Sequence, residues 1–403
     1  MNILHIVGSL SNGGAALGAK VLHEELLKFG INSKILYLKD LNYKTSKASL
    51  NSGNLLEKFS AFFFQRFENN LLSIIFPQKS PIIFSTALYS WSFKKYIKYH
   101  NIDIINVHWP GYGAFSFSIF SKLNVVFTMR DMWLATAGCH MPMNCTNYKN
   151  ECANCPILSK KNSFFKNFVT KALFLRKKKW IKKSKKLEIV GISKYVSSFG
   201  NSPILKTKKI HIINNCIDFD NMKKRAKNFE WSPSKILYES KVLIPKKTQE
   251  IWKGFNDLEN QIPELSKKFE IAQFGRGDDY PRLKDFGFIS SRKMLYALYE
   301  SASVFINPTK FEPFGKVIIE SAAVGTPVII QKGANIGIDK SLPFIFEADF
   351  SSLKDLISRI EIATKAKKKN NNLGNEWYDI CTKLYSPTAQ AKKYIDLYRD
   401  ILK

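Results

Sequence analysis

Short apolar runs alternate with amphipathic segments from the start of the chain. MNILHIVGSL (1–10) predicts a strand, SNGGAALG (11–18) a glycine turn, and AKVLHEELLKFG (19–30) an amphipathic helix. The helix is expected to end at Gly30, because glycine is common at helix C-termini. INSKILYL (31–38) then predicts a second strand. A strand, a helix and a second strand in this order are typical of a parallel sheet.

The same alternation continues through two successive halves of the chain. Buried strands are predicted in the first half by IDIINVHW (102–109), NVVFTM (124–129), LEIVGIS (187–193) and KIHIINN (209–215). After Asp218 a second set follows: KVLIP, KFEIAQFG, ASVFINP and TPVII, separated by helical segments such as SRKMLYALYESA and GKVIIESAAVG. SPTAQAKKYIDLYRDILK (386–403) predicts an amphipathic helix. We therefore expect an α/β protein with a boundary near residues 214–222.

Length and charge narrow the number of domains and the classes of partner that the protein is expected to have. A chain of 403 residues is too long for one ordinary core, so two domains are expected. It carries 62 basic and 33 acidic residues, a net charge of +29, which favours phosphates, nucleic acid or an anionic membrane as partners. Abundant Lys, Asn, Ile and Phe indicate that compositional drift supplies part of this excess. We expect neither a signal peptide nor a spanning helix, and hence a cytoplasmic protein.

Two glycine-containing segments are candidates for anion binding. Gly13 and Gly14 lie between a strand and a helix, where backbone N–H groups can hold an anion. A tight turn without a ligand is the alternative, because the full G-x-G-x-x-G spacing is absent.

The second segment, FEPFGKVIIE (311–320), follows a strand and begins a helix near Gly315. Its backbone amides would point beyond the end of the strand, where open α/β sheets bind ligands. The alternative is a surface pair between Lys316 and Glu320, which would leave Glu312 unexplained.

Glu312 and Glu320 match the E-x7-E motif of retaining glycosyltransferase family 4, which the chain resembles over most of its length. The supporting segments are LYESASV (298–304), SAAVGTPV (321–328), FGFIS (286–290, similar to an "lGfv" strand), NNCID (214–218, with Cys216 replacing glycine) and Gly13-Gly14-Ala15. The resemblance implies a GT-B fold, in which two Rossmann-like domains face each other across a cleft. Residues 1–215 would bind the acceptor, residues 216–385 would bind the nucleotide sugar, and residues 386–403 would pack back on the first domain.

The resemblance also implies roles for single residues. Glu320 would accept hydrogen bonds from ribose, and Glu312 would hold the transferred sugar. The amides of Phe314, Gly315 and Lys316 would face the sugar and the diphosphate.

Lysines would neutralise the diphosphate. The resemblance assigns this role to the lysine that precedes a glycine, which is Lys253 in Trp252-Lys253-Gly254. We expect Lys247 to be the second basic residue at the diphosphate, with Lys246 and Lys241 as alternatives. Any of them could instead be a solvated surface lysine. Lysines and helix N-termini can stabilise a leaving diphosphate without a metal, so no catalytic cofactor is expected. Asp218-Phe219-Asp220 has D-x-D metal-site spacing, but it falls in the interdomain segment.

Arg130 departs from the family pattern. VFTMRDMW (126–133) resembles "wTlHDmW", with arginine in place of the usual histidine. Arginine cannot serve as a general base near neutral pH. We therefore expect Arg130 to act electrostatically on phosphate or acceptor, or else only to pair with Asp131.

Four cysteines follow in a short loop (139–156). Cys139, Cys145, Cys152 and Cys155 have the number and spacing of a tetrahedral zinc site, and a subset of family 4 has a similar insert. The alternatives are reduced buried thiols, disulfides or a cluster. His140 could replace one thiol as a ligand.

Residues 160–186 hold twelve basic residues and no acidic one, interleaved with aromatic and aliphatic side chains. Such a stretch can lie on an anionic bilayer. The alternative is a helix that packs its apolar face on the first domain and leaves a basic face in solvent.

The resemblance and the residues together predict a metal-independent hexosyltransferase. It would move a sugar from a UDP- or GDP-sugar to a glycan acceptor, which we expect to be lipid-linked, in bacterial exopolysaccharide, capsule or lipopolysaccharide synthesis. We expect it in the cytoplasm or on the inner face of the membrane, with no nucleic-acid partner. The alternatives are a basic nucleic-acid-binding protein and an inactive glycosyltransferase-like scaffold.

Overall fold

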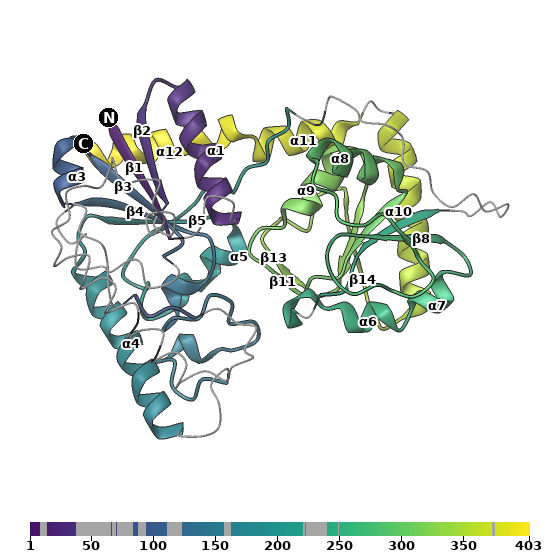
Figure 1. The fold of residues 1–403 in the computed structure, drawn as a ribbon, viewed down its shortest axis with the longest axis horizontal. Coiled ribbons are helices and arrows are strands. Elements are labelled where there is room, and N and C mark those ends of the chain that lie inside the picture. Colours follow the sequence, from purple (N-terminus) through teal and green to yellow (C-terminus); the bar gives the residue numbers. More distant parts are fainter. Residues whose placement is uncertain are drawn as a thin grey trace. The chain divides into compact units, whose positions relative to one another are not determined.

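The computed structural model divides the chain into two compact units. It describes residues 1–8, 14–37, 66, 70, 84–87, 94–110, 123–156, 163–220, 222, 240–248, 250–372 and 375–403. The first unit contains Met1–Cys216 and Gln390–Lys403, and the second contains Ile217–Ala389 (Figure 1). The sequence placed these divisions at 215/216 and 385/386, one and four residues from the observed ones.

Six parallel strands form the sheet of the first unit. In chain order they are β1 (Asn2–Val7), β2 (Asn32–Tyr37), β3 (Ile104–His108), β4 (Asn124–Met129), β5 (Leu187–Gly191) and β6 (Ile210–Ile212). They are arranged β2-β1-β3-β4-β5-β6, and each neighbouring pair is parallel. All six lie within the segments expected from the apolar runs.

Helices from both ends of the chain complete the core of this unit. The helices are α1 (Gly14–Lys28), α3 (Lys94–Tyr99), α4 (Ser163–Lys183), α5 (Lys194–Ser197) and α12 (Pro387–Leu402). Leu22 and Leu26 of α1 belong to the same buried cluster as Tyr394 and Tyr398 of α12. The Tyr398 hydroxyl accepts a 2.7 Å hydrogen bond from the amide of Asn106 in β3. The C-terminal helix therefore packs on the first unit, as expected.

The second unit has a similar parallel sheet. Its strands are β7 (Lys241–Pro245), β8 (Glu270–Phe274), β9 (Lys284–Asp285), β10 (Val304–Asn307), β12 (Val328–Gln331) and β14 (Ile345–Ala348), in the order β14-β12-β10-β7-β8-β9. β11 (Phe311–Glu312) and β13 (Asn335–Ile336) form a separate parallel pair. The strand expected at FGFIS (286–290) is wrong: β9 ends at Asp285, and the following residues are irregular.

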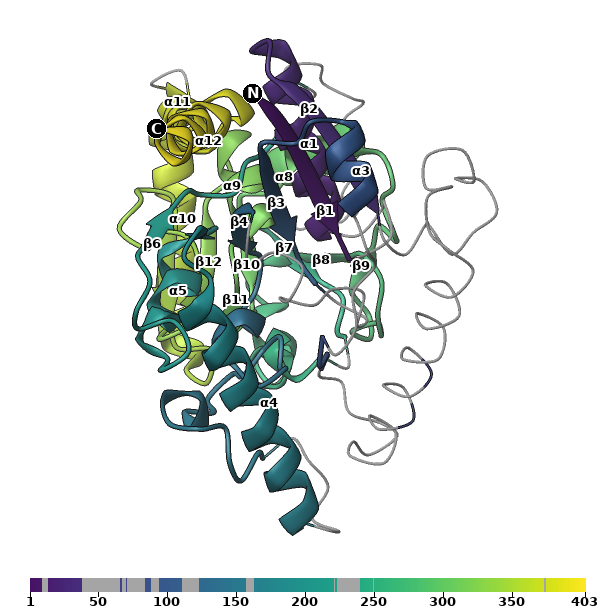
Figure 2. The same cartoon turned by 90° about the vertical axis from the view of Figure 1, so that its left-hand side faces the viewer.

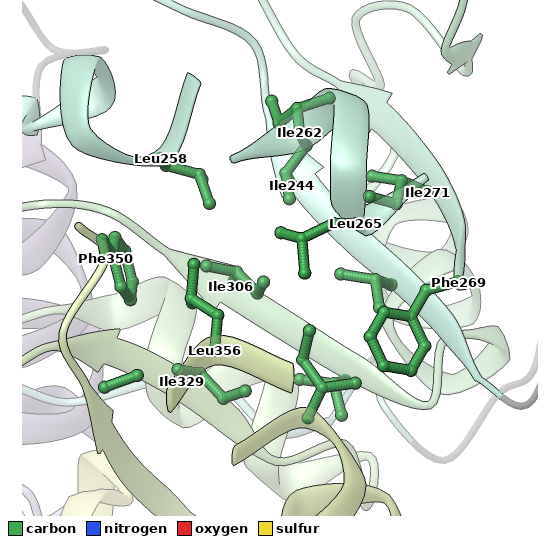
Figure 3. Packing of buried hydrophobic residues seen from close by; sticks show 14 of the residues in the cluster. Ile244, Leu258, Ile262, Leu265, Phe269, Ile271, Ile306, Ile329, Phe350 and Leu356 are labelled. Atoms are coloured by element: carbon green, nitrogen blue, oxygen red, sulfur yellow. The ribbon is translucent and has the colours of Figure 1, made fainter. Parts of the chain in front are cut away.

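Helices supply the rest of the second core. They are α6 (Phe255–Glu259), α7 (Ile262–Leu265), α8 (Arg292–Ser301), α9 (Lys316–Ala323), α10 (Leu353–Asn372) and α11 (Glu376–Tyr385). Figure 3 shows Leu265 of α7 and Leu356 of α10 on either side of Ile306, which lies in the central strand β10. This packing fixes the strands whose ends carry the candidate site. Among the helices in the described ranges, none is both long and apolar enough to cross a membrane.

Candidate functional site

The second sheet changes its direction of winding between β7 and β10. From β7 the chain adds β8 and β9 on one side, and it then adds β10, β12 and β14 on the other. In open α/β sheets, ligands bind at such a point, beyond the carboxyl ends of the strands. The segments that follow these two strands here are 246–254 and 308–315. They contain Lys246, Lys247, Lys253 and Glu312, whereas the alternative Lys241 is the first residue of β7, at the opposite end of that strand.

Backbone contacts fix the position of Glu312. Its carbonyl oxygen accepts a 2.9 Å hydrogen bond from the Gly337 N–H, beyond the short β11–β13 pair. A Cβ at Gly337 would lie 2.1 Å from the Pro313 carbonyl oxygen, so only glycine fits there. Gly315 then adopts φ +100° as the N-cap residue immediately before α9. A left-handed residue at this point turns the chain from the strand into the helix.

Lys253 reaches Glu312 from the other segment. The Lys310 N–H donates a 2.8 Å hydrogen bond to the Trp252 carbonyl oxygen, which ties the two segments together. The Lys253 Nζ lies 3.4 Å from a carboxylate oxygen of Glu312, and both side chains are more than a quarter exposed. Exposed pairs of this kind contribute little to stability. The contact can therefore open when an anionic ligand arrives.

Glu320 has a different partner. Its side chain is only 5% exposed on α9, and one carboxylate oxygen lies 2.7 Å from Nη1 of Arg292. The same guanidinium nitrogen donates a 3.3 Å hydrogen bond to the Tyr296 hydroxyl. Burial lowers the pKa of Arg292, but Glu320 and Tyr296 outweigh it and raise the pKa above its usual value. Arg292 could not be found from the sequence, because 28 residues separate it from Glu320.

Lys247 and Lys246 are each paired with other carboxylates. The Lys247 Nζ lies 2.5 Å from Glu259, the last residue of α6. The Lys246 Nζ lies 2.7 Å from Asp279 and 2.6 Å from Asp285. Neither lysine is in an ion pair with Glu312 or Glu320 among the described residues. Lys253 is thus the predicted lysine that the fold brings to Glu312.

Arg130 is buried in the first unit. Nη1 donates a 2.9 Å hydrogen bond to the Asn215 side chain, and Nη2 lies 3.1 Å from Nδ1 of His108. Only 8% of the residue is exposed. The alternative pair with Asp131 is not found within the described residues, because Asp131 instead contacts His140 at 2.7 Å. Arg130 therefore lies beneath the surface, contacting neutral groups.

Two buried histidines, His108 and His5, extend the series of polar contacts that begins at Arg130. Burial, and next the charge of Arg130, holds the pKa of His108 well below its usual value. A neutral His108 accepts from Arg130 at Nδ1, so its Nε2 carries the proton and donates to His5 across 3.0 Å. Burial, together with His23 and Arg130, lowers the pKa of His5 to about 3. Gly14 begins α1 nearby in the sequence, whereas Gly13 lies outside the described residues.

The four cysteines of the loop line one small cavity, of about 20 Å³. All four are free thiols; burial raises the pKa of Cys139 well above its usual value and that of Cys152 to about 11. His140 is occupied by Asp131, Trp109 and Ser85, so a ligand set containing it is disfavoured. As the side chains stand, no three potential ligands in the described ranges are arranged to hold a metal ion. Zinc stays a prediction.

Solved structures with this fold cover the whole chain. A glycosyltransferase from Rickettsia africae superposes with a TM-score of 0.59 at 17% identity and covers 100% of this chain and 98% of its own. HepE of Anabaena, solved in complex with UDP-glucose, gives 0.54 at 12% identity, covering 99% and 100%. The fold is accordingly that of the GT-B class of glycosyltransferases, as expected.

Sequence comparisons are more specific for the second unit. Residues 241–357 match the family described as glycosyl transferases group 1, and they include the whole second sheet and both glutamates. This part of the chain is therefore of the group 1 type.

Two curated relatives match over shorter segments. An uncharacterized glycosyltransferase 335 of Sulfolobus islandicus rod-shaped virus 1 is 33% identical over 85 residues, which is 19% of this chain and 25% of the relative. The O-antigen biosynthesis glycosyltransferase WclY of Escherichia coli is 25% identical over 154 residues, 35% of this chain and 42% of the relative. The chain thus matches less than half the length of either relative.

Proposed function

We propose that this protein is a retaining hexosyltransferase that uses a UDP- or GDP-sugar without a catalytic metal. The observation that carries the proposal is the position of the two glutamates within the group 1 segment. Glu312 and Glu320 frame the turn at Gly315, beyond the strands where the sheet changes its winding direction. The UDP-glucose complex of HepE, which has the same fold, supports a nucleotide-sugar donor.

In the proposed reaction, the bond between the sugar and the diphosphate breaks and a bond to the acceptor oxygen forms with the same stereochemistry. Glu320 accepts hydrogen bonds from the ribose, and Glu312 holds hydroxyls of the sugar. Lys253 leaves Glu312 and moves toward the diphosphate, where its charge stabilises the negative charge that develops. The amides of Phe314, Gly315 and Lys316 add partial positive charge at the start of α9. The leaving phosphate takes the proton of the acceptor hydroxyl.

We further propose a glycan acceptor of bacterial surface polysaccharide, carried on a lipid. The support is that WclY of Escherichia coli, which matches this chain over 154 residues, is described as a glycosyltransferase of O-antigen biosynthesis. The first unit would bind this acceptor, with Arg130 holding the neighbouring groups in place. The protein would then act in the cytoplasm, at the inner face of the cell membrane.

A donor panel tests the proposal. Thermal unfolding is followed with UDP-, GDP- and ADP-sugars, and sugar transfer or hydrolysis is measured with each. A cognate donor at a hundred times its Kd should add about 2.7 kcal/mol to the free energy of unfolding. Glu320→Ala should lose this stabilisation, and Glu312→Ala should mainly slow transfer.

The matched control is Glu264→Ala, which removes a carboxylate that is about half exposed on α7. It should leave both measurements unchanged. Stabilisation by no nucleotide sugar, together with tight binding of RNA or DNA, would support the basic nucleic-acid-binding alternative. Donor binding without any turnover would support the inactive scaffold.

A further inference from the structure

Helix α4 exposes three phenylalanines at its N-terminal end. Phe164 is 87% exposed, Phe168 is 65% exposed and Phe165 is 48% exposed. Figures 1 and 2 both show α4 extending beyond the sheet of the first unit, with its N-terminal end farthest from the sheet. Large apolar side chains gathered on a surface typically mark an interaction site.

The buried side of α4 has an unexpected composition. Leu173, Phe174 and Ile181 are buried, but so are Lys166 and Lys177. The Lys177 Nζ donates hydrogen bonds of 2.6 Å and 2.9 Å to the carbonyl oxygens of Trp133 and Thr136. The helix is therefore not divided into an apolar and a basic side. Leu173 and Phe174 are taken up by the protein core, which leaves the N-terminal phenylalanines as its main exposed apolar group.

Lysines continue the exposed side beyond the phenylalanines. Phe164 and Phe168 are four residues apart, and so are Lys178 and Lys182, both of which are exposed. Residues four apart lie on the same side of a helix. Leu175, which is 42% exposed, lies between the two pairs. No acidic residue occurs between 160 and 186, and among the described residues Glu151 of the cysteine loop pairs with Lys171.

We propose that this surface, which we name the α4 face (Phe164, Phe165, Phe168, Leu175, Lys178 and Lys182), docks on an anionic lipid bilayer. The phenylalanines would enter the boundary between headgroups and acyl chains, and the lysines would contact lipid phosphates. The charge decides the occupant, because exposed lysines on a helix that has no carboxylate of its own complement an anionic surface. Only the biological role of this docking rests on the proposed function: it would bring the enzyme to a lipid-linked acceptor.

Vesicle sedimentation with the full chain tests the assignment. The probes are vesicles of phosphatidylcholine alone and of phosphatidylcholine mixed with phosphatidylglycerol. The wild type should bind the mixed vesicles far more tightly, and added salt should weaken the binding. Lys178→Ala/Lys182→Ala should reduce the partition coefficient by about 30-fold, at roughly five-fold for each lysine near the surface. Phe164→Ser/Phe168→Ser should reduce it by about ten-fold or more.

Matched controls lie on α3, where Lys98 and Tyr99 are also exposed. Lys98→Ala and Tyr99→Ser should bind vesicles like the wild type. Equal binding to both vesicle types, or unchanged binding in both α4 double variants, would overturn the proposal. Self-association that disappears in Phe164→Ser/Phe168→Ser would also overturn it and identify a second copy as the occupant.

Donor stabilisation separates this proposal from the proposed function. The α4 variants should keep the melting-temperature shift with nucleotide sugar, since α4 lies outside the second unit. A wild type that binds anionic vesicles but no nucleotide sugar would contradict the proposed function alone. A wild type that binds nucleotide sugar but no vesicles would contradict the α4 assignment alone.

Discussion

At the residue scale, Glu320 is held by a partner that the sequence does not reveal. A buried carboxylate needs hydrogen bonds or a cation, and Arg292 provides both through a 2.7 Å contact. The arginine itself is about half exposed, so one side of its guanidinium faces outward. We infer that Arg292 is a positioning residue, which orients Glu320 and leaves the second carboxylate oxygen for a ligand.

Arg292→Ala should weaken donor binding. Loss of the cation leaves the buried Glu320 carboxylate without its partner, which costs about 1–3 kcal/mol of stability. The carboxylate is then no longer held for the donor, so the donor KM should rise by roughly ten-fold, about 1.4 kcal/mol, with a smaller effect on kcat. Arg292→Lys should restore part of the affinity, because it keeps the charge but loses the planar geometry. Lys293→Ala, on the neighbouring exposed position of α8, is the control. An unchanged donor KM in Arg292→Ala would show that the contact is dispensable.

The buried histidines predict a sensitivity to acid. The pKa of His5 is about 3 in the folded chain and near 6.5 when it is unfolded. Between these values the unfolded chain binds more protons, so stability is complete above pH 6.5 and is lost as the pH falls. At pH 5 the loss from His5 alone is about 2 kcal/mol.

Urea unfolding at pH 7 and pH 5 measures this effect. His5→Gln should reduce the difference between the two pH values strongly, whereas His100→Gln should reduce it much less, because the pKa of His100 is also lowered but the residue is only partly buried. A wild type that is equally stable at both pH values would contradict the expected titration of His5.

At the element scale, the β11–β13 pair supports the candidate site. Gly337→Ala would place a Cβ 2.1 Å from the Pro313 carbonyl oxygen, and the backbone would have to move. We expect a loss of about 1–3 kcal/mol in the free energy of unfolding, as for other overpacked positions, together with weaker donor binding. Denaturant unfolding and donor titration measure the two effects.

Gly14→Ala is the control, because no atom lies within 4 Å of the added Cβ. Its stability should be unchanged or slightly higher, since alanine is favoured over glycine in helices. Wild-type stability in Gly337→Ala would mean that the β11–β13 crossing is less tightly packed than the contact indicates.

The cysteine loop is the second element with a testable consequence. We propose that rotation of Cys139, Cys145, Cys152 and Cys155 into their shared cavity allows a structural zinc ion to bind. Metal analysis should then find about one zinc per chain, and Cys152→Ser or a chelator should remove it and lower the melting temperature. Cys381→Ser is the control, because that thiol is buried in the second unit. Metal-free protein with full stability would instead favour reduced thiols.

At the scale of the whole molecule, periodicity predicted where most of the strands lie along the chain and that they fall into two α/β halves. The prediction succeeded because short, continuous apolar runs that alternate with helices are typical of parallel strands buried on both faces. It failed where the partner is distant: nothing near Glu320 in the sequence indicates Arg292, and nothing near Arg130 indicates His108. β14 (Ile345–Ala348) was missed because its burial is only partial.

The roles of basic residues were the least predictable part of the site. In a chain with 62 of them, sequence position alone cannot separate a lysine that meets Glu312 from one that meets Glu259. The same difficulty applies to α4, where Lys177 is buried and Phe164 is exposed, opposite to what residue type alone predicts. Tertiary contacts decide these cases.

The return of α12 to the first unit also constrains how the protein is made. The N-terminus of a chain leaves the ribosome first, and domains generally fold in the order in which they emerge. Here Tyr394 and Tyr398, with the other buried apolar residues of α12, belong to a core whose remaining buried members precede residue 217. The core of the first unit therefore cannot be completed until the whole of the second unit has been synthesised. During translation the second unit can reach its native state before the core of the first unit is complete.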